Sequence, residues 1–235
     1  MKNLILTILF SQVTLMVSGQ ADPLTLKKEK NTTLLYTADF TKELDQKEWV
    51  TEIESQGRGV VDAKSGRLMI DTRGGVTVWL NRKLKGNILI EYERTVLMEG
   101  KDNDRLSDMN QFWMALDPRN LNLFTRNGAF AQYDSLQLYY VGMGGNTNST
   151  TRFRKYDGSG NKPLLSEFTD ADHLLKPNRK YRISILLKDN VTSYWVDGEC
   201  YFTYRDPNPL REGYFGFRSV HSRQVVENFR VYLLR

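Results

Sequence analysis

Two arginines separated by one residue, Arg152 and Arg154, stand in the segment TTRFRKY and could bind an anion. Alternate residues of a β-strand point to the same face, so the two guanidinium groups would lie side by side with Phe153 opposite. Such a pair can hold a carboxylate through several charge-assisted hydrogen bonds. The pattern therefore predicts an anion-binding face, with a solvated edge strand as the alternative.

The segment before these arginines, LYYVGMGGNTNST over residues 138–150, joins adjacent tyrosines to a glycine-rich turn. It lacks the Gly-Lys-Ser/Thr ending and the following helix of a phosphate-binding loop, so we exclude that function. Tyr139 and Tyr140 must point to opposite faces of a strand, so one belongs to the core and the other could stack on a ligand or donate a proton. The glycines allow a tight turn that would place Asn146 at the rim of a site.

Histidine is the side chain that changes charge near neutral pH without special help, and the sequence has two, His173 and His221. We expect His221 in a loop between the last two strands, flanked by Arg218 and Arg223. Neighbouring positive charge favours the neutral imidazole, which could then act as a base. An exposed loop histidine without a function is the alternative at both positions.

Strand-length runs with period-two alternation must position these residues, and no long helical pattern competes with them. Turn residues separate the runs, among them an Asp197-Gly198 pair that predicts a two-residue hairpin. The regular spacing favours an all-β sandwich or barrel. The clearest predicted strands cover 75–81, 87–97, 109–116, 135–143, 180–187, 192–196, 200–204, 213–218 and 226–234.

In the run 109–116, alternation does not decide which face of the strand lines a groove and which is buried. Asn110 shares a face with Phe112, whereas Gln111 shares the other face with Trp113, so only one of the two amides can point into a groove.

Further along, the segment 158–178 is predicted to be a long loop without regular structure, and long loops are often functional.

The N-terminal residues are typical of an export signal. A short basic start precedes an apolar run over residues 4–17, and small residues follow at 17–19. The run is too short and too polar for a comfortable membrane span, and no cysteine stands near the cleavage site to carry a lipid. We predict a signal peptide over 1–19, a disordered lead-in over 20–33 and one domain over 34–235, in a secreted or periplasmic protein that keeps no stable membrane anchor after cleavage.

The composition narrows the choice of partner. A formal net charge of +5 and a sequence pI of about 9.2 suit an acidic ligand, although the charges are scattered along the chain. An exported protein is a poor candidate for nucleic-acid binding, so we expect no nucleic-acid partner. The single cysteine, Cys200, excludes an internal disulfide, and a core of this size does not need one.

The last four predicted strands carry the patterns Y-x-I-x-I, Y-x-V-D-G, G-Y-F-G-F-R and N-F-R-V. These patterns resemble the concanavalin A-like lectin and glucanase superfamily. The segments DMNQFWMALDP and LYYVGMGGNTNSTTRFR are similar to a secreted bacterial branch of it without an established activity. The resemblance implies an all-β jelly-roll sandwich of two curved antiparallel sheets with a groove for a polysaccharide. Relatives include lectins, glycoside hydrolases and polysaccharide lyases, and the fold alone does not choose among them.

The available side chains favour a lyase over a hydrolase of the familiar type. Retaining glycosidases need two carboxyls about 5 Å apart, and the E-x-D-x-x-E motif of jelly-roll glucanases is absent here. Glu91 and Glu93 are the nearest substitute, and they also fit an exposed strand face. Jelly-roll lyases commonly use Arg, Asn or Gln, His and Tyr to neutralise a uronate, remove its α-proton and protonate the leaving oxygen, and this chain has all of these types.

We therefore predict a carbohydrate-active protein that binds and cleaves a uronate-containing poly- or oligosaccharide by β-elimination. A non-catalytic glycan-binding module and a hydrolase with an atypical carboxylate pair are the alternatives. No cofactor is expected, and a structural calcium ion stays open because Asp102, Asp104 and Asp108 or Asp170 and Asp172 could hold one. The catalytic candidates are His221, Tyr140 and Arg152, and the substrate-binding candidates are Asn110, Gln111, Trp113, Tyr139, Asn146, Arg154 and Arg218.

Overall fold

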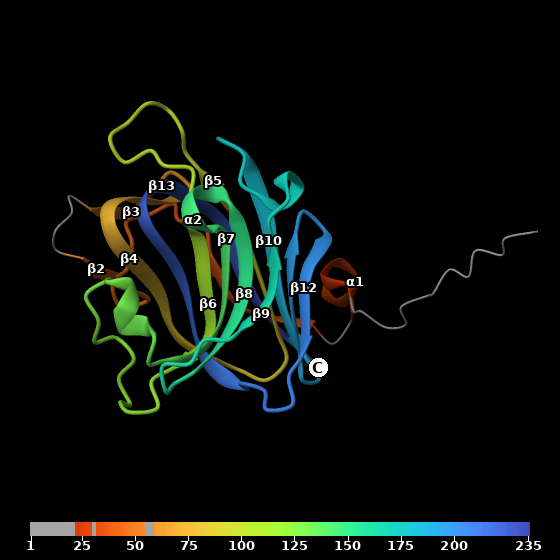
Figure 1. Ribbon diagram of the computed structural model, residues 1–235. Helices are drawn as coiled ribbons and strands as arrows, with labels where there is room; N and C mark the ends of the chain where they lie inside the picture. The colour runs from red at the N-terminus through yellow and green to blue at the C-terminus, as the bar shows by residue number, and fades with distance from the viewer. Residues whose placement is uncertain (1–21, 30–31, 55–58) are drawn as a thin grey trace, which may run out of the picture.

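The computed structural model describes residues 22–29, 32–54 and 59–235, and their regular structure is almost entirely β (Figure 1). The predicted signal peptide over 1–19 lies outside the described residues. Short helical turns are α1 (Pro23–Lys27), η1 (Phe130–Tyr133), α2 (Gly145–Asn148) and η2 (Ala171–His173). The strands are β1 (Thr32–Ala38), β2 (Trp49–Ile53), β3 (Val60–Lys64), β4 (Arg67–Lys85), β5 (Ile88–Val96), β6 (Met109–Leu116), β7 (Gln137–Gly144), β8 (Thr150–Asp157), β9 (Leu164–Phe168), β10 (Lys180–Lys188), β11 (Val191–Val196), β12 (Glu199–Arg205) and β13 (Glu212–Leu234).

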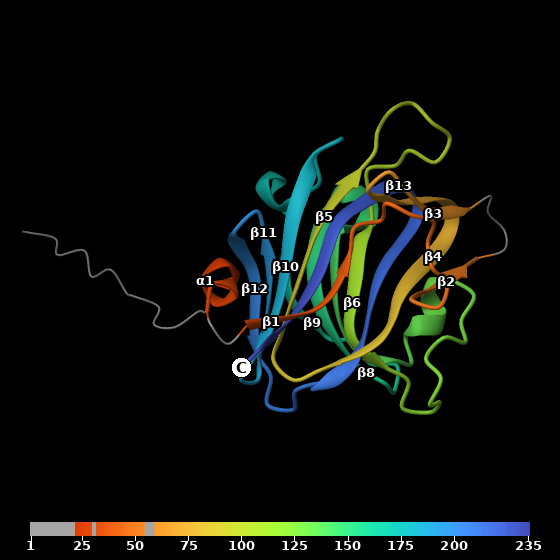
Figure 2. The same ribbon diagram turned by 180° about the vertical axis from the view of Figure 1, so that it is seen from behind.

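The strands form two curved antiparallel layers that share their longest members (Figures 1 and 2). One layer follows the order β12-β11-β10-β5-β13, and the other continues β13-β6-β7-β8-β9. The first half of β13 pairs with β6 and the second half with β5, while β4 runs beside it through most of its length. This arrangement confirms the predicted jelly-roll sandwich.

The core lies between the two layers and is rich in aromatic rings. Trp113 stacks on Phe153 with ring centroids 5.8 Å apart, and Phe153 in turn meets Phe202 of the opposite layer at 5.7 Å. Tyr139 packs against Trp113 in the same cluster. Burying aromatic side chains of this size removes a large apolar area from water, which is the main force that holds the layers together.

The predicted loop around His221 is wrong, because β13 is continuous from Glu212 to Leu234. His221 lies at a β-bulge, with a φ of 43° and a register shift against β4 between Val220 and Ser222. A bulge bends a strand sharply, so it lets one strand leave the first layer and join the second. Two predicted strands therefore become a single bent one.

The predicted disordered lead-in is also wrong over its described part. Asp22 accepts hydrogen bonds from the backbone N–H groups of Leu24 and Thr25 and so begins α1, and β1 starts at Thr32. Leu26 is buried against the outer face of β5, β10 and β13 (Figure 2), and Lys27 forms an ion pair with Glu91 at 2.6 Å. The segment is lysine-rich, so its composition predicted disorder and gave no sign of the buried Leu26.

The predicted structureless segment 158–178 contains strand β9 and the turn η2, so that expectation is wrong as well. β9 pairs with β8 at the edge of its layer, where its half-exposed side chains show no clear alternation. Within the described residues, no helix is both long and apolar enough to cross a membrane.

Candidate functional site

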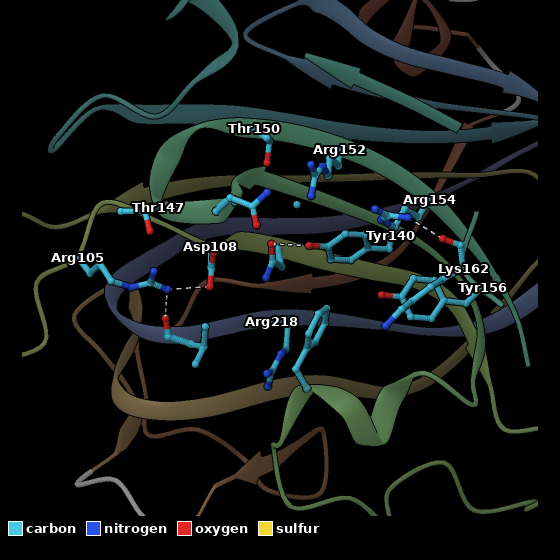
Figure 3. A pocket seen from close by; sticks show the side chains of 16 residues that line it. Arg105, Asp108, Tyr140, Thr147, Thr150, Arg152, Arg154, Tyr156, Lys162 and Arg218 are labelled. Atoms are coloured by element: carbon cyan, nitrogen blue, oxygen red, sulfur yellow. Dashed lines mark hydrogen bonds and ion pairs between the residues drawn. The ribbon is translucent and has the colours of Figure 1, made fainter. Parts of the chain in front are cut away.

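A cavity of about 500 Å³ lies on the face of β6, β7, β8 and β13 that is turned away from the core (Figure 3). We call it the arginine cavity, because several guanidinium groups line it. Its lining residues are Arg105, Asp108, Asn110, Phe130, Tyr140, Gly142, Gly145, Asn146, Thr147, Thr150, Arg152, Arg154, Tyr156, Lys162, Arg218 and Val220.

Strand alternation carries the β8 side chains into this cavity. Arg152, Arg154 and Tyr156 point toward it, whereas Phe153 points into the core between the layers. On β7 the same rule places Tyr140 in the cavity and Tyr139 in the core. The sequence predicted that Arg152 and Arg154 share a face and that Tyr139 and Tyr140 lie on opposite faces. It did not predict which face lines the cavity.

Tyr140 lies along its own strand, and its hydroxyl donates a hydrogen bond to Oδ1 of Asn110 at 3.1 Å (Figure 3). Gly142, two residues on and on the same face, makes room for the ring. A Cβ at that position would overlap the Tyr140 hydroxyl and lie 2.7 Å from the ring carbon that bears it. Burial raises the pKa of Tyr140 well above its usual range, so the phenol is protonated at neutral pH and can donate a proton or a hydrogen bond.

Replacing Gly142 with alanine is expected to lower the free energy of unfolding by about 1–3 kcal/mol, the usual cost of forcing extra atoms into a packed site. The Tyr140 ring must move, so its contact with Asn110 should be lost. Urea unfolding of Gly142→Ala in the wild-type and Tyr140→Ala backgrounds measures this effect. The cost should be smaller once the ring is gone, since only the Asn110 amide, with Oδ1 2.6 Å from the new Cβ, must still move. Equal costs in both backgrounds would contradict the account.

Arg218 is the most deeply buried cation of the arginine cavity, with 1% of its surface exposed. One terminal nitrogen donates to the backbone carbonyl of Gly128, and the guanidinium stands over the rings of Phe130 and Tyr133 at 5.1 and 5.3 Å. Its Nε has no hydrogen-bond partner in the described part of the chain, and no carboxylate there forms an ion pair with it. Burial lowers the pKa of Arg218.

The other cations at the cavity are partly neutralised. Arg105 binds Asp108 at 2.8 Å, Arg152 pairs with Glu167, and Lys162 binds Asp134 at 2.6 Å. Among the sixteen lining residues five carry positive charge and one, Asp108, is a carboxylate. Arg154, which donates to the backbone carbonyl of Lys162, resembles Arg218 in having no ion pair with a described carboxylate. The lining of the cavity therefore carries an excess of positive charge.

A segment over residues 117–136, which we call the roof loop, packs on the same face beside the cavity and contains η1 (Figure 1). Leu123, Tyr133 and Leu136 of this loop bury the rings of Trp79 and Phe112. The exposed Phe130 ring of the roof loop forms one wall of the cavity. The roof loop thus turns an open sheet face into a bounded pocket.

Glu52 of β2 ties the roof loop to the sheet and is 4% exposed. Its Oε2 accepts hydrogen bonds from Trp79 Nε1 and the Tyr133 hydroxyl, both at 2.8 Å, and its Oε1 accepts the backbone N–H of Arg126 at 2.6 Å. The Arg126 guanidinium also binds Asp117 at 2.6 Å. Buried polar groups joined in this way fix a loop firmly.

The turn between β7 and β8 forms the opposite rim. Gly144, Asn146, Thr147 and Asn148 all have positive φ, from 51° to 72°. Left-handed backbone is costly for a β-branched residue such as threonine, and strain of this kind is often found at binding sites. Asn148 holds the turn in place by exchanging hydrogen bonds of 3.0 and 2.9 Å with the backbone of Leu175.

The structure brings six of the ten predicted site residues to this one cavity and places four elsewhere. The six are Asn110, Tyr140, Asn146, Arg152, Arg154 and Arg218. Gln111, Trp113 and Tyr139 are buried on the core side, where they bond to Val141, Thr192 and Asp206, so they cannot contact a ligand in the cavity.

His221, the predicted base, does not line the cavity. Its backbone carbonyl accepts a hydrogen bond from Arg105 Nε at 2.9 Å, which ties the bulge of β13 to the cavity wall. Sequence reasoning missed several lining residues. Tyr156 continues the period-two pattern of Arg152 and Arg154 and could have been found, whereas Phe130 and Lys162 come from loops that carry no such signal.

Carboxylates do not gather at the cavity as a hydrolase or a metal site would need. Glu91 and Glu93 lie on the outer face of β5, where they pair with Lys27 and Lys180. No three His, Cys, Asp or Glu side chains in the described ranges are arranged to hold a metal ion. Of the predicted calcium ligands, Asp104 and Asp108 bind arginine side chains.

Comparison with known proteins gives a family and a fold. A family model described as Domain of unknown function (DUF6250) matches residues 70–229. No curated protein matches the sequence. A protein of unknown function with a galectin-like fold from Bacillus subtilis superposes with a TM-score of 0.70 at 18% identity, covering 86% of this chain and 98% of that one.

Two other similar structures have names that refer to carbohydrates. An endo-β-1,3-glucanase from Pyrococcus furiosus has a TM-score of 0.61 at 10% identity and covers 87% of this chain and 95% of its own. The carbohydrate-binding module CBM66 from Bacillus subtilis has a TM-score of 0.54 at 13% identity, with 78% and 94% covered. The superpositions show that these proteins share a concanavalin A-like fold, and at such low identities they show the fold alone. This fold confirms the resemblance seen in the sequence.

Proposed function

The chain belongs to the family described as Domain of unknown function (DUF6250), and we propose that it binds an acidic carbohydrate in the arginine cavity. The observation that carries this proposal is Arg218, a guanidinium almost completely removed from water, without a carboxylate partner among the described residues and facing the cavity. The acidic group of the sugar, a uronate carboxylate, would lie between Arg218 and Arg154.

Burying a charge without a counter-ion is unfavourable, because the group loses its hydration and gains little in return. Arg218 recovers part of that loss from one carbonyl and two aromatic faces. An anionic ligand would supply the missing partner, and its charge would be attracted strongly because Arg218 is almost completely removed from water. The Nε of Arg218 and the hydroxyl of Thr150 are buried and have no hydrogen-bond partner among the described residues.

The remaining wall suits a sugar ring. Phe130, Tyr140 and Tyr156 offer apolar ring faces, and Asn110, Asn146 and Thr147 offer hydrogen-bonding groups. Pockets that combine apolar surface with a few placed polar groups are typical of small-ligand sites. The names of two proteins with this fold, a glucanase and a carbohydrate-binding module, support a carbohydrate as the ligand. The predicted export signal would take the protein to where such glycans occur.

Cleavage by β-elimination is the second candidate function, and Tyr140 favours it. A base removes the proton α to the carboxylate, the electron pair forms a carbon–carbon double bond, and the leaving oxygen takes a proton from the Tyr140 hydroxyl. Arg154 and Arg218 would neutralise the carboxylate, with Arg152, the residue predicted for this role, beside them. Because His221 does not line the cavity, Asp108 is the lining residue left for the role of base. Hydrolysis needs two carboxyls, and the described lining contains one.

The test is incubation of the full mature chain with a panel of uronate-containing polysaccharides and neutral β-glucans. Binding is measured by calorimetry, unsaturated products by absorbance, and cleavage by new reducing ends. We expect binding to at least one uronate-containing polymer and none to the neutral glucans. Absorbance together with reducing ends would establish elimination. Reducing ends without absorbance would indicate hydrolysis, and preferential binding of the neutral glucans would contradict the proposal.

A further inference from the structure

The roof loop closes the arginine cavity on the side of β4. There the backbones of Gly75 and Gly128 touch, because a Cβ at either position would collide with the carbonyl oxygen of the other. A Cβ at Gly128 would also lie 2.6 Å from the backbone nitrogen of Glu54. Contact of this kind, glycine against glycine and backbone against backbone, leaves no passage for a ligand between the roof loop and the sheet.

This closure is part of the folded core, since the roof loop is not loosely placed. Tyr133 and Leu136 are fully buried, and the buried carboxylate of Glu52 holds both the Tyr133 hydroxyl and the backbone of Arg126. Arg218 adds a further bond from β13 to Gly128. Opening the β4 side would expose these groups together, which makes it a rigid wall.

The opposite side of the cavity is open. Asn146 and Thr147 of the β7–β8 turn are exposed, Arg152 and Arg154 are half-buried, and Arg218 is buried. Figure 3 shows Arg152 and Arg154 on one side of the cavity and Arg218 on the other. A ligand that reaches Arg218 therefore meets a closed end.

We infer that the arginine cavity takes the terminal residue of an acidic glycan chain and excludes residues within the chain. An internal residue continues into neighbours on both sides, and the Gly75–Gly128 contact blocks its continuation toward β4. The acidic group of the terminal residue binds Arg218, and the next residue lies between Arg152 and the rim at Asn146. The inference rests on the proposed binding function and adds which part of the glycan is recognised.

The recognition of the terminal residue is tested by comparing binding with the number of chain ends in the polymer. The uronate-containing polymer that binds best in the panel is cut at random to several mean lengths, and saturation binding of the full mature chain is measured at constant polymer mass. We expect the bound protein to increase in proportion to the number of chain ends, by about tenfold for a tenfold shorter polymer. The dissociation constant, expressed per chain end, should change less than about twofold between the fragments.

The outcomes separate this inference from the function on which it rests. A capacity that stays constant or falls as the polymer is shortened would show that internal residues are bound, and would overturn the end recognition while leaving acidic-glycan binding intact. Several protein molecules on each long chain would overturn it in the same way. If no acidic glycan binds at any length, both proposals are wrong.

Discussion

Replacing Arg218 with glutamine is expected to weaken binding of the acidic glycan by between about 10-fold and 100-fold. Hydrogen bonds to a charged group are worth about 1.5–3 kcal/mol, and each 1.4 kcal/mol changes the dissociation constant by about tenfold. Arg218 is the buried cation of the cavity and no described carboxylate pairs with it, so an anionic ligand should depend on it strongly. Calorimetric titration of the variant measures the loss.

The fold should tolerate this change. The shorter glutamine side chain gives up the bond to the carbonyl of Gly128, but removing a buried guanidinium also removes the cost of keeping it from water. Arg182→Gln is the matched control, because the Arg182 side chain is 73% exposed on β10 and does not line the cavity. An unchanged dissociation constant in folded Arg218→Gln would rule out Arg218 as the anion-binding group.

Replacing Glu52 with alanine is expected to lower the free energy of unfolding by about 3 kcal/mol or more. The change leaves Trp79 Nε1, the Tyr133 hydroxyl and the Arg126 backbone N–H without their acceptor. Each unsatisfied buried donor costs about 1–3 kcal/mol, and breaking a buried network is among the few single changes with effects this large. Urea unfolding of the variant and the wild-type protein checks the value.

Glu48→Ala is the control for the Glu52 variant. Glu48 is an exposed carboxylate just before β2, and its nearest cationic partner, Arg82, stands 3.9 Å away. Loss of a surface carboxylate of this kind should change stability by less than about 0.5 kcal/mol. If Glu52→Ala costs no more than Glu48→Ala, the carboxylate does not hold the roof loop in place.

Most of the strands could be predicted from the sequence because their alternation is local. The run 109–116 coincides with β6, and the runs around 180–187 and 200–204 fall within β10 and β12. The turn at Asp197 and Gly198 joins β11 to β12 as expected. Local pattern failed where a strand changes layers, since the bulge at His221 looks like a loop when only neighbouring residues are read.

The candidate site was predictable in part for the same reason. Period two fixes which residues share a face, so Arg152 and Arg154 had to stay together and Tyr139 and Tyr140 had to separate. It does not say which face meets the second layer. Both faces of β6 offer an amide, Asn110 on one and Gln111 on the other, and either could have faced the core between the layers.

The sequence by itself therefore determined an all-β sandwich or barrel and the grouping of polar side chains along each strand, because both follow from alternation within a few residues, and the resemblance of its motifs to a known superfamily added the jelly roll. Only the tertiary structure decided that Asn110 and Tyr140 face the cavity, since that depends on where the other layer packs. Only it shows that the roof loop, distant in sequence from β4 and β13, meets Gly75 and covers Arg218. Burial of that guanidinium is a property of the assembled chain, and it is the observation on which the proposed binding of an acid rests.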